Sequence, residues 1–153
     1  MRTIKFRAWH KGVKEMAKVD TLHSNGYVHL SPITKISSDS KMFKLVDVEL
    51  MQFTGLLDKN GKEIYEGDIL KVRARDKGFN IHKRNETFWT DFYEFLGEVY
   101  TEPMMWLFRP VEKTGWQGHL VTINAHVKES GGEIEIIGNI YENPELLSNQ
   151  SVL

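Results

Sequence analysis

The sequence contains no cysteine, and this absence removes several classes of function at once. A chain without thiols has no disulfide bridges, no thiolate nucleophile and no cysteine-ligated zinc site. No apolar run approaches the length of about 18 residues that a membrane-spanning helix requires. The first residues, Met1 to Phe6, alternate polar and apolar types and lack the apolar stretch of a secretion signal. We therefore expect a soluble, cytoplasmic protein.

The sequence also has almost no net charge, since its formal charge at pH 7 is only −1. That small value conceals an asymmetry. Residues 1–84 carry 17 Lys and Arg against 10 Asp and Glu, net +7, and residues 85–153 carry 3 against 11, net −8. One interpretation is a bipolar surface that binds a second copy of the chain. The other is that the two halves neutralise each other within one monomer.

Short segments with strand patterns dominate the first half of the chain. Apolar residues at positions 4, 6 and 8 alternate with polar or amphipathic ones, a period of two that predicts a half-buried strand. Asn60-Gly61 lies between two further runs and predicts a tight hairpin of type I′, in which both residues take positive φ. Further strands are expected at 15–20, 26–30, 42–53 and 69–75, with a loop at 31–40.

The second half is harder to assign. Aromatic residues at 88, 89, 92, 93 and 95 recur at helical spacing, with Asn85 and Gly97 as start and stop signals. We expect a short helix before Gly97, and a strand is the alternative for residues 86–96. Strands should follow around Glu102-Pro103. Residues 112–132 look irregular, a final strand is expected at 134–141, and Asn143-Pro144 predicts a short terminal helix.

Three segments carry a family resemblance. Residues 5–9 read KFRAW, residues 50–56 read LMQFTGL and lead into DKNGKEIYEGDI at 58–69, and residues 137–147 read IGNIYENPELL. In this order and spacing they resemble the YopX family of phage and prophage proteins. Residues 76–92 and 112–130 match no recognisable pattern. His10 departs from the family, in which an acidic residue usually follows the tryptophan.

The resemblance implies a phage-encoded, cytoplasmic protein that assembles with itself and has no established biochemical activity. The expected fold is mainly β, with a hairpin-rich, small barrel-like core, an N-terminal β subdomain and a short C-terminal helix. It is one YopX-like domain over 1–153, divided into subdomains at 1–53 and 54–148. The residues that carry the resemblance are turn formers and core aromatics, which are typical of a fold rather than a site.

No catalytic, cofactor or metal-binding apparatus is recognisable. The glycines before Lys62 are spaced wrongly for a phosphate-binding loop, and residues 58–61 place their glycine wrongly for a calcium loop. Glu133 and Glu135 share one face of the predicted final strand and look solvated. None of the histidines pairs at a short spacing that would put two imidazoles on one metal ion. They are His10, His23, His29, His82, His119 and His126.

One cluster of basic residues rises above this background. Lys71, Arg73 and Arg75 share one strand face, and Lys83 and Arg84 continue the positive charge. We call these five residues the basic row; Trp89 is a candidate stacking surface beside it. A solvated strand edge is the favoured interpretation of the row, because lysine and arginine also discourage edge pairing.

Several functions fit this sequence. The favoured one is a non-enzymatic, homo-oligomeric phage accessory protein that binds a copy of itself or a host protein. A nucleic-acid-binding small β-barrel using the basic row at 71–84 is one alternative. An oligomeric protein that sequesters a nucleotide between subunits is another. No catalytic residue, metal or cofactor is expected, nor a membrane partner.

Overall fold

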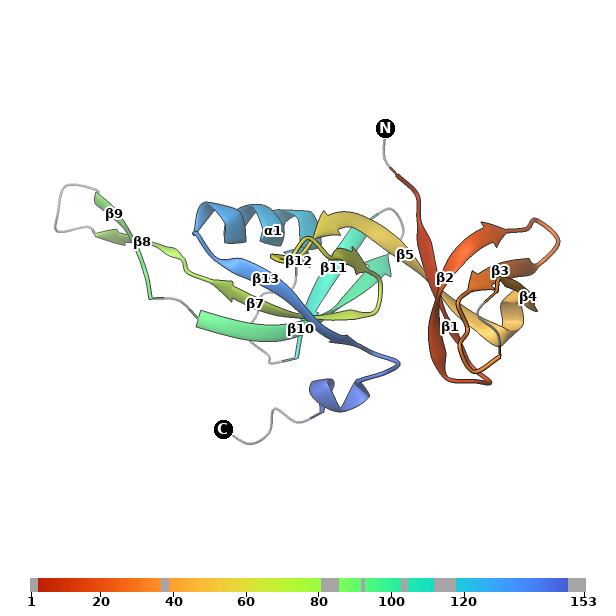
Figure 1. Ribbon diagram of the computed structural model, residues 1–153. Helices are drawn as coiled ribbons and strands as arrows, with labels where there is room; N and C mark the ends of the chain where they lie inside the picture. Colours follow the sequence, from red (N-terminus) through yellow and green to blue (C-terminus); the bar gives the residue numbers. More distant parts are fainter. Residues whose placement is uncertain are drawn as a thin grey trace. The chain divides into compact units, whose positions relative to one another are not determined.

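The computed structural model describes residues 3–36, 39–80, 86–91, 93–102, 105–111 and 118–148. It is mostly β, built of antiparallel sheets with one α-helix (Figure 1), which confirms the predicted class. The chain divides into two compact units. Unit 1 is Met1–Gly55 and unit 2 is Leu56–Leu153. The boundary predicted from the sequence lies between residues 53 and 54, two residues before the observed one.

Unit 1 is a meander of antiparallel strands in the order β4-β3-β2-β1-β5. Its core is aliphatic, since Ala8, Ala17, Val28, Leu30 and Val48 are all buried and alternate with residues that are mostly half-buried. β5 continues into unit 2, and β6 is the next strand in its hydrogen-bonded order. The elements are β1 (Phe6–His10), β2 (Glu15–Leu22), β3 (Tyr27–Ser31), β4 (Lys41–Lys44), the 3-10 helix η1 (Leu45–Asp47) and β5 (Val48–Leu57).

Unit 2 is a five-stranded sheet in the order β12-β11-β10-β7-β13, with α1 packed on one face (Figure 1). Leu120, Ile123 and Val127 of α1 meet Val72 and Phe108 in its core. The elements are β6 (Glu63–Tyr65), β7 (Asp68–Ala74), β8 (Lys77–Asn80), β9 (Glu86–Trp89), β10 (Tyr93–Glu102), β11 (Met105–Pro110), β12 (Gly118–His119), α1 (Leu120–Glu129), β13 (Glu133–Asn139) and η2 (Pro144–Leu147). η2 confirms the predicted C-terminal helix.

The barrel-like core was wrong, because the sheet does not close. Its edge strands β12 and β13 do not pair with each other in the described residues. Instead, the Lys59 N–H donates to the Ile134 carbonyl at 2.8 Å, and the Ile136 N–H donates to the Asp58 carboxylate at 3.3 Å. The turn after β5 therefore covers the outer edge of β13, where another strand would otherwise add.

The hairpin between β5 and β6 is confirmed, but its turn type differs from the prediction. Gly61 has a φ of +79°, whereas Asn60 does not take a positive φ. The Gly61 N–H donates to the Asp58 carbonyl at 3.0 Å, which places Lys59 and Asn60 at the centre of the turn. The cause is the Asp58 carboxylate, which accepts the N–H of Asn60 at 2.8 Å and that of Lys62 at 2.9 Å. This Asx turn, in which a side chain takes the place of a backbone acceptor, fixes the first residues of the loop.

Two assignments in the second half were wrong. The segment predicted to be a helix before Gly97 forms β9 and the start of β10, in residues 86–91 and 93–96. Tyr93, Phe95 and Val99 also share one strand face, and pairing with β7 selects that alternative. The stretch interpreted as irregular contains α1, whose buried positions Leu120, Ile123, Asn124 and Val127 follow helical spacing. No helix in the described part of the chain is long and apolar enough to cross a membrane.

Candidate functional site

The structure places the predicted basic row only in part. Leu70, Val72 and Ala74 of β7 are buried, so Lys71 and Arg73 lie on the opposite, outer face of the sheet, and Arg75 follows on the same parity. Lys83 and Arg84 lie outside the described residues. Trp89 is paired with Lys77 in the β8–β9 ribbon, and its side chain is not described.

The cations of this row face carboxylates on the neighbouring strands. Lys71 Nζ lies 2.8 Å from Glu94 Oε2. The register sets Arg73 directly between Glu94 of β10 and Glu133 of β13. Arg75 turns to the end of α1, where its Nε donates to the Ser130 carbonyl at 2.7 Å. The outer face is therefore a ladder of opposite charges rather than a positive stripe, as expected for cross-strand pairs.

The two glutamates singled out in the sequence share one ammonium group. Lys59 Nζ lies 2.9 Å from Glu133 Oε1 and 2.8 Å from Glu135 Oε2. Hydrogen bonds to Glu135 and Glu133 raise the pKa of Lys59 to about 12. The hydrogen bond from Lys59 lowers the pKa of Glu133, against an opposing effect of burial. A carboxylate held ionised in this way is a poor general acid at neutral pH.

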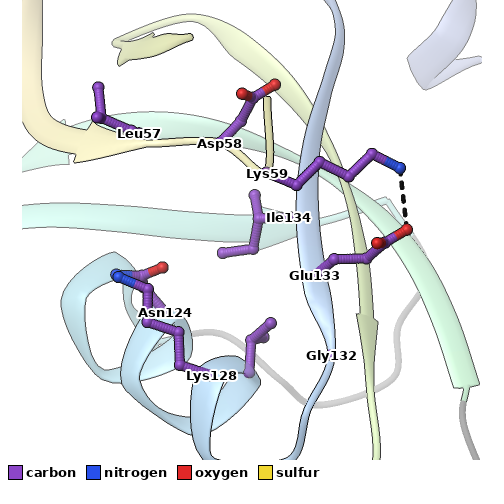
Figure 2. Close-up of a pocket in the computed structure, with 9 residues that line it drawn as sticks. Leu57, Asp58, Lys59, Asn124, Lys128, Gly132, Glu133 and Ile134 are labelled. Carbon is purple, nitrogen blue, oxygen red and sulfur yellow. Dashed lines mark hydrogen bonds and ion pairs between the residues drawn. The ribbon is translucent and has the colours of Figure 1, made fainter. Parts of the chain in front are cut away.

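A small pocket lies between α1, the start of β13 and the end of β5 (Figure 2). Its volume is about 110 Å³, and its walls combine Leu57, Asn124, Val127 and Ile134 with the Lys59–Glu133 ion pair. Pockets that hold drug-sized ligands usually measure about 300 to 1,000 Å³. This pocket is therefore too small to enclose a nucleotide within one chain.

A cluster that the sequence did not suggest joins α1 to the junction of β7 and β8. Tyr93 Oη donates to Asp76 Oδ1 at 3.1 Å, and His126 Nε2 lies 3.3 Å from the same oxygen. Burial and the Asp76 carboxylate together raise the pKa of Tyr93 to about 12. The phenol therefore stays protonated at neutral pH, and its hydrogen bond to Asp76, with the contact of His126, links α1 to the junction of β7 and β8.

A second unforeseen juxtaposition lies in unit 1. The rings of His23 on the β2–β3 turn and His29 on β3 are 5.1 Å apart. Spacings within one element do not reveal this pair, because the imidazoles meet across a hairpin. The signal that would have found them is the turn at Ser24 to Gly26, which sets His23 beside β3. Among the described residues, no three His, Asp or Glu side chains gather as metal ligands.

Comparison with known proteins gives a family and a fold. Residues 5–148 match the family model described as YopX protein. No curated protein is similar enough to count as a relative. Among solved structures, the crystal structure of protein EF1440 from Enterococcus faecalis is similar, with a TM-score of 0.58 and 25% sequence identity. That match covers 96% of this chain and 99% of the other.

Proposed function

The chain belongs to the YopX family, and on that premise we propose that it is a phage or prophage accessory protein that acts by binding rather than by catalysis. It works in the cytoplasm of the host cell and assembles with copies of itself. The family membership supports this assignment, and so does the distribution of charge between the two units.

The observation that carries the proposal is the opposite charge of the two compact units. Unit 1 has 9 Lys and Arg against 5 Asp and Glu, net +4. Unit 2 has 11 against 16, net −5. Two such units of different copies attract each other, and complementary patches of this kind steer association and set its register.

The contacts of unit 2 favour binding over catalysis. The charged side chains that could hold an anion or act on a substrate are already paired, since Lys59 lies against Glu133 and Lys71 against Glu94. The same contacts make nucleic acid a weaker candidate ligand, because a phosphate backbone would have to displace Glu94 from Lys71. Unit 1 keeps its excess of positive charge, and the exposed Lys41 and Lys44 of β4 contribute to it.

Light scattering at several salt concentrations tests the proposal. At physiological salt and tens of micromolar protein, we expect more than one subunit per particle. The mass should fall toward that of the monomer as salt rises to about 1 M, where the Debye length shrinks from about 8 Å to about 3 Å. A monomer at physiological salt, or a mass that ignores salt, contradicts the proposal.

A charge reversal locates the effect in unit 1. Lys41→Glu with Lys44→Glu reduces the formal charge of unit 1 from +4 to zero and should weaken association. The matched control, Lys41→Arg with Lys44→Arg, keeps the charge and should assemble like the parent. Equal masses for the two variants would exclude the charge of β4 as a cause.

A further inference from the structure

Three potential metal ligands lie on one face of the β2–β3–β4 sheet in unit 1. His29 of β3 is paired with Thr21 on β2 and with Met42 on β4. The His23 N–H donates to the Tyr27 carbonyl at 2.9 Å, which continues the same ladder. Val28 and Leu30 are buried on the opposite face. His23 on the turn after β2, His29 on β3 and Met42 on β4 therefore share the outer face.

The separation of the two imidazoles suits one metal ion. The ring centroids of His23 and His29 are 5.1 Å apart, and the ring planes are inclined at 51°. A bond of about 2.0 to 2.1 Å from an imidazole nitrogen to the metal puts each ring centroid roughly 3.2 Å from the ion. Two rings at a tetrahedral angle are then about 5 Å apart. The pair needs no rearrangement of the backbone to reach this spacing.

A second observation points to a ligand at this place. The Nε2 atom of His23 is buried and has no hydrogen-bond partner among the described residues. Buried polar atoms are nearly always paired, and an orphan of this kind calls for a bound water or ion. A metal ion held between the two rings would satisfy it.

The thioether of Met42 limits which metal ions the site would favour. Its side chain is 56% exposed although it lies on a strand, and its neighbour across the ladder is His29. Thioether sulfur is a soft ligand that favours copper(I), whereas imidazole alone accepts zinc, nickel and copper alike. The unbranched methionine side chain has three rotatable bonds and adapts readily to a ligand beside it.

Negative charge lies close by as well. The Asp20 carboxylate accepts a hydrogen bond from Ser31 Oγ and lies near His29. Hydrogen bonds from Ser31 and Ser40 lower the pKa of Asp20, against an opposing effect of burial. A carboxylate beside His29 favours a cation on this face.

We propose that His23 and His29, with the Met42 thioether as a third donor, bind one copper ion per chain on the outer face of unit 1. Water completes the coordination. This binding activity goes beyond the assembly proposed above and does not depend on it.

Titration of the full chain with copper tests the proposal. The metal-free protein is titrated with copper(II) alone and, in a separate anaerobic arm, with copper(I). We expect one ion per chain, and nitrogen hyperfine structure in the copper(II) electron paramagnetic resonance spectrum. His23→Gln and His29→Gln should each weaken binding at least about tenfold, since each removes a ligand. His119→Gln removes an exposed histidine of unit 2 and should bind like the parent.

Further variants separate the roles. Met42→Leu keeps a similar apolar volume and should weaken copper(I) binding while leaving copper(II) binding nearly unchanged. Circular dichroism melting confirms that each variant is folded. Parent protein that binds no copper at 100 μM, or a folded His23→Gln, His29→Gln double variant that binds as tightly as the parent, overturns the proposal. Equal affinities of zinc and copper(I), unchanged by Met42→Leu, would overturn the assignment to copper.

Discussion

On the outer face of unit 2, the strands set each cation against a carboxylate, as Lys71 lies against Glu94 and Lys59 against Glu133 and Glu135. On β3 and β4 of unit 1 the register is different. Met42 faces His29 and Lys44 faces Tyr27, and no carboxylate stands opposite any residue of this ladder. The outer face of unit 2 thus neutralises its own charges across the strands, whereas the β3–β4 ladder of unit 1 sets no cation opposite a carboxylate.

The difference between these two faces indicates which polar groups an external ligand can reach. Charged pairs across a sheet stabilise and specify the fold, and an external ligand must compete with them. A ladder whose cations and imidazoles have no carboxylate directly opposite gains more from a ligand, because no cross-strand ion pair has to be displaced. The basic row, the clearest feature of the sequence, belongs to the first kind of face, and the histidine pair belongs to the second.

The largest effect should come from the tight packing of unit 2. A Cβ atom on Gly97 would overlap the Phe108 ring and the Arg109 carbonyl. Gly97→Ala should therefore lower the free energy of unfolding by about 3 kcal/mol, as overpacking does in a dense core. Gly26→Ala in unit 1 has no atom within 4 Å of the new Cβ but a φ of +86°, so it should cost only about 1 kcal/mol. Urea unfolding measures the free energy of unfolding of both variants. Equal decreases would show that Gly97 is not packed more tightly than Gly26.

A smaller effect should follow from the carboxylate that covers the edge of β13. Asp58 is 7% exposed and accepts the N–H groups of Lys62, Ile136 and Asn60. Asp58→Ala leaves these N–H groups without an acceptor and should lower the free energy of unfolding by about 2 kcal/mol. Asp91→Ala removes an exposed loop carboxylate and should change the unfolding midpoint little.

The same carboxylate should make unit 2 sensitive to acid. Burial alone would raise the pKa of Asp58, but the hydrogen bonds from Lys62, Ile136 and Asn60 outweigh it and lower the pKa below 3.8. The resulting stability is complete above the unfolded value and is lost as pH falls through the folded pKa. Urea midpoints from pH 5 down to pH 2.5 should fall more steeply for the parent than for Asp58→Asn. Parallel curves would show that Asp58 does not titrate with folding.

A moderate effect is expected at the turn itself. Gly61 has a φ of +79°, where a β-branched residue is strained. Gly61→Val should cost about 1.5 kcal/mol, whereas Gly61→Asn should cost less, because asparagine tolerates the left-handed conformation. If the valine variant matched the asparagine variant in urea unfolding, the positive φ would not be what the turn requires.

The smallest effect should be found on the basic row. Because carboxylates already face Lys71 and Arg73, the parent should bind DNA and RNA no more tightly than roughly 1 μM at physiological salt. Replacing Lys71, Arg73 and Arg75 together by Gln should change little in a fluorescence anisotropy titration. Tighter, salt-sensitive binding that the triple variant loses would break the comparison between the two faces and favour the nucleic-acid alternative.

Local patterns predicted much of the fold. The alternation in β1 to β3, the hairpin at residues 56–65 and the Asn143-Pro144 start of η2 were all readable, because each depends on residues close in sequence. The failures involve choices that neighbours in space decide. The aromatics before Gly97 suit a helix or a strand, and the ladder with β7 selects the strand.

By itself, the sequence determined the mainly β class, the absence of thiol chemistry, the family and the opposite charges of the two halves. Only the tertiary structure decided which charges matter. Strand register set Glu94 and Glu133 beside Arg73, and a hairpin set His23 beside His29, six positions away. Contacts across strands depend on pairing and register, which arise from the packing of a whole sheet, so composition and local periodicity cannot supply them.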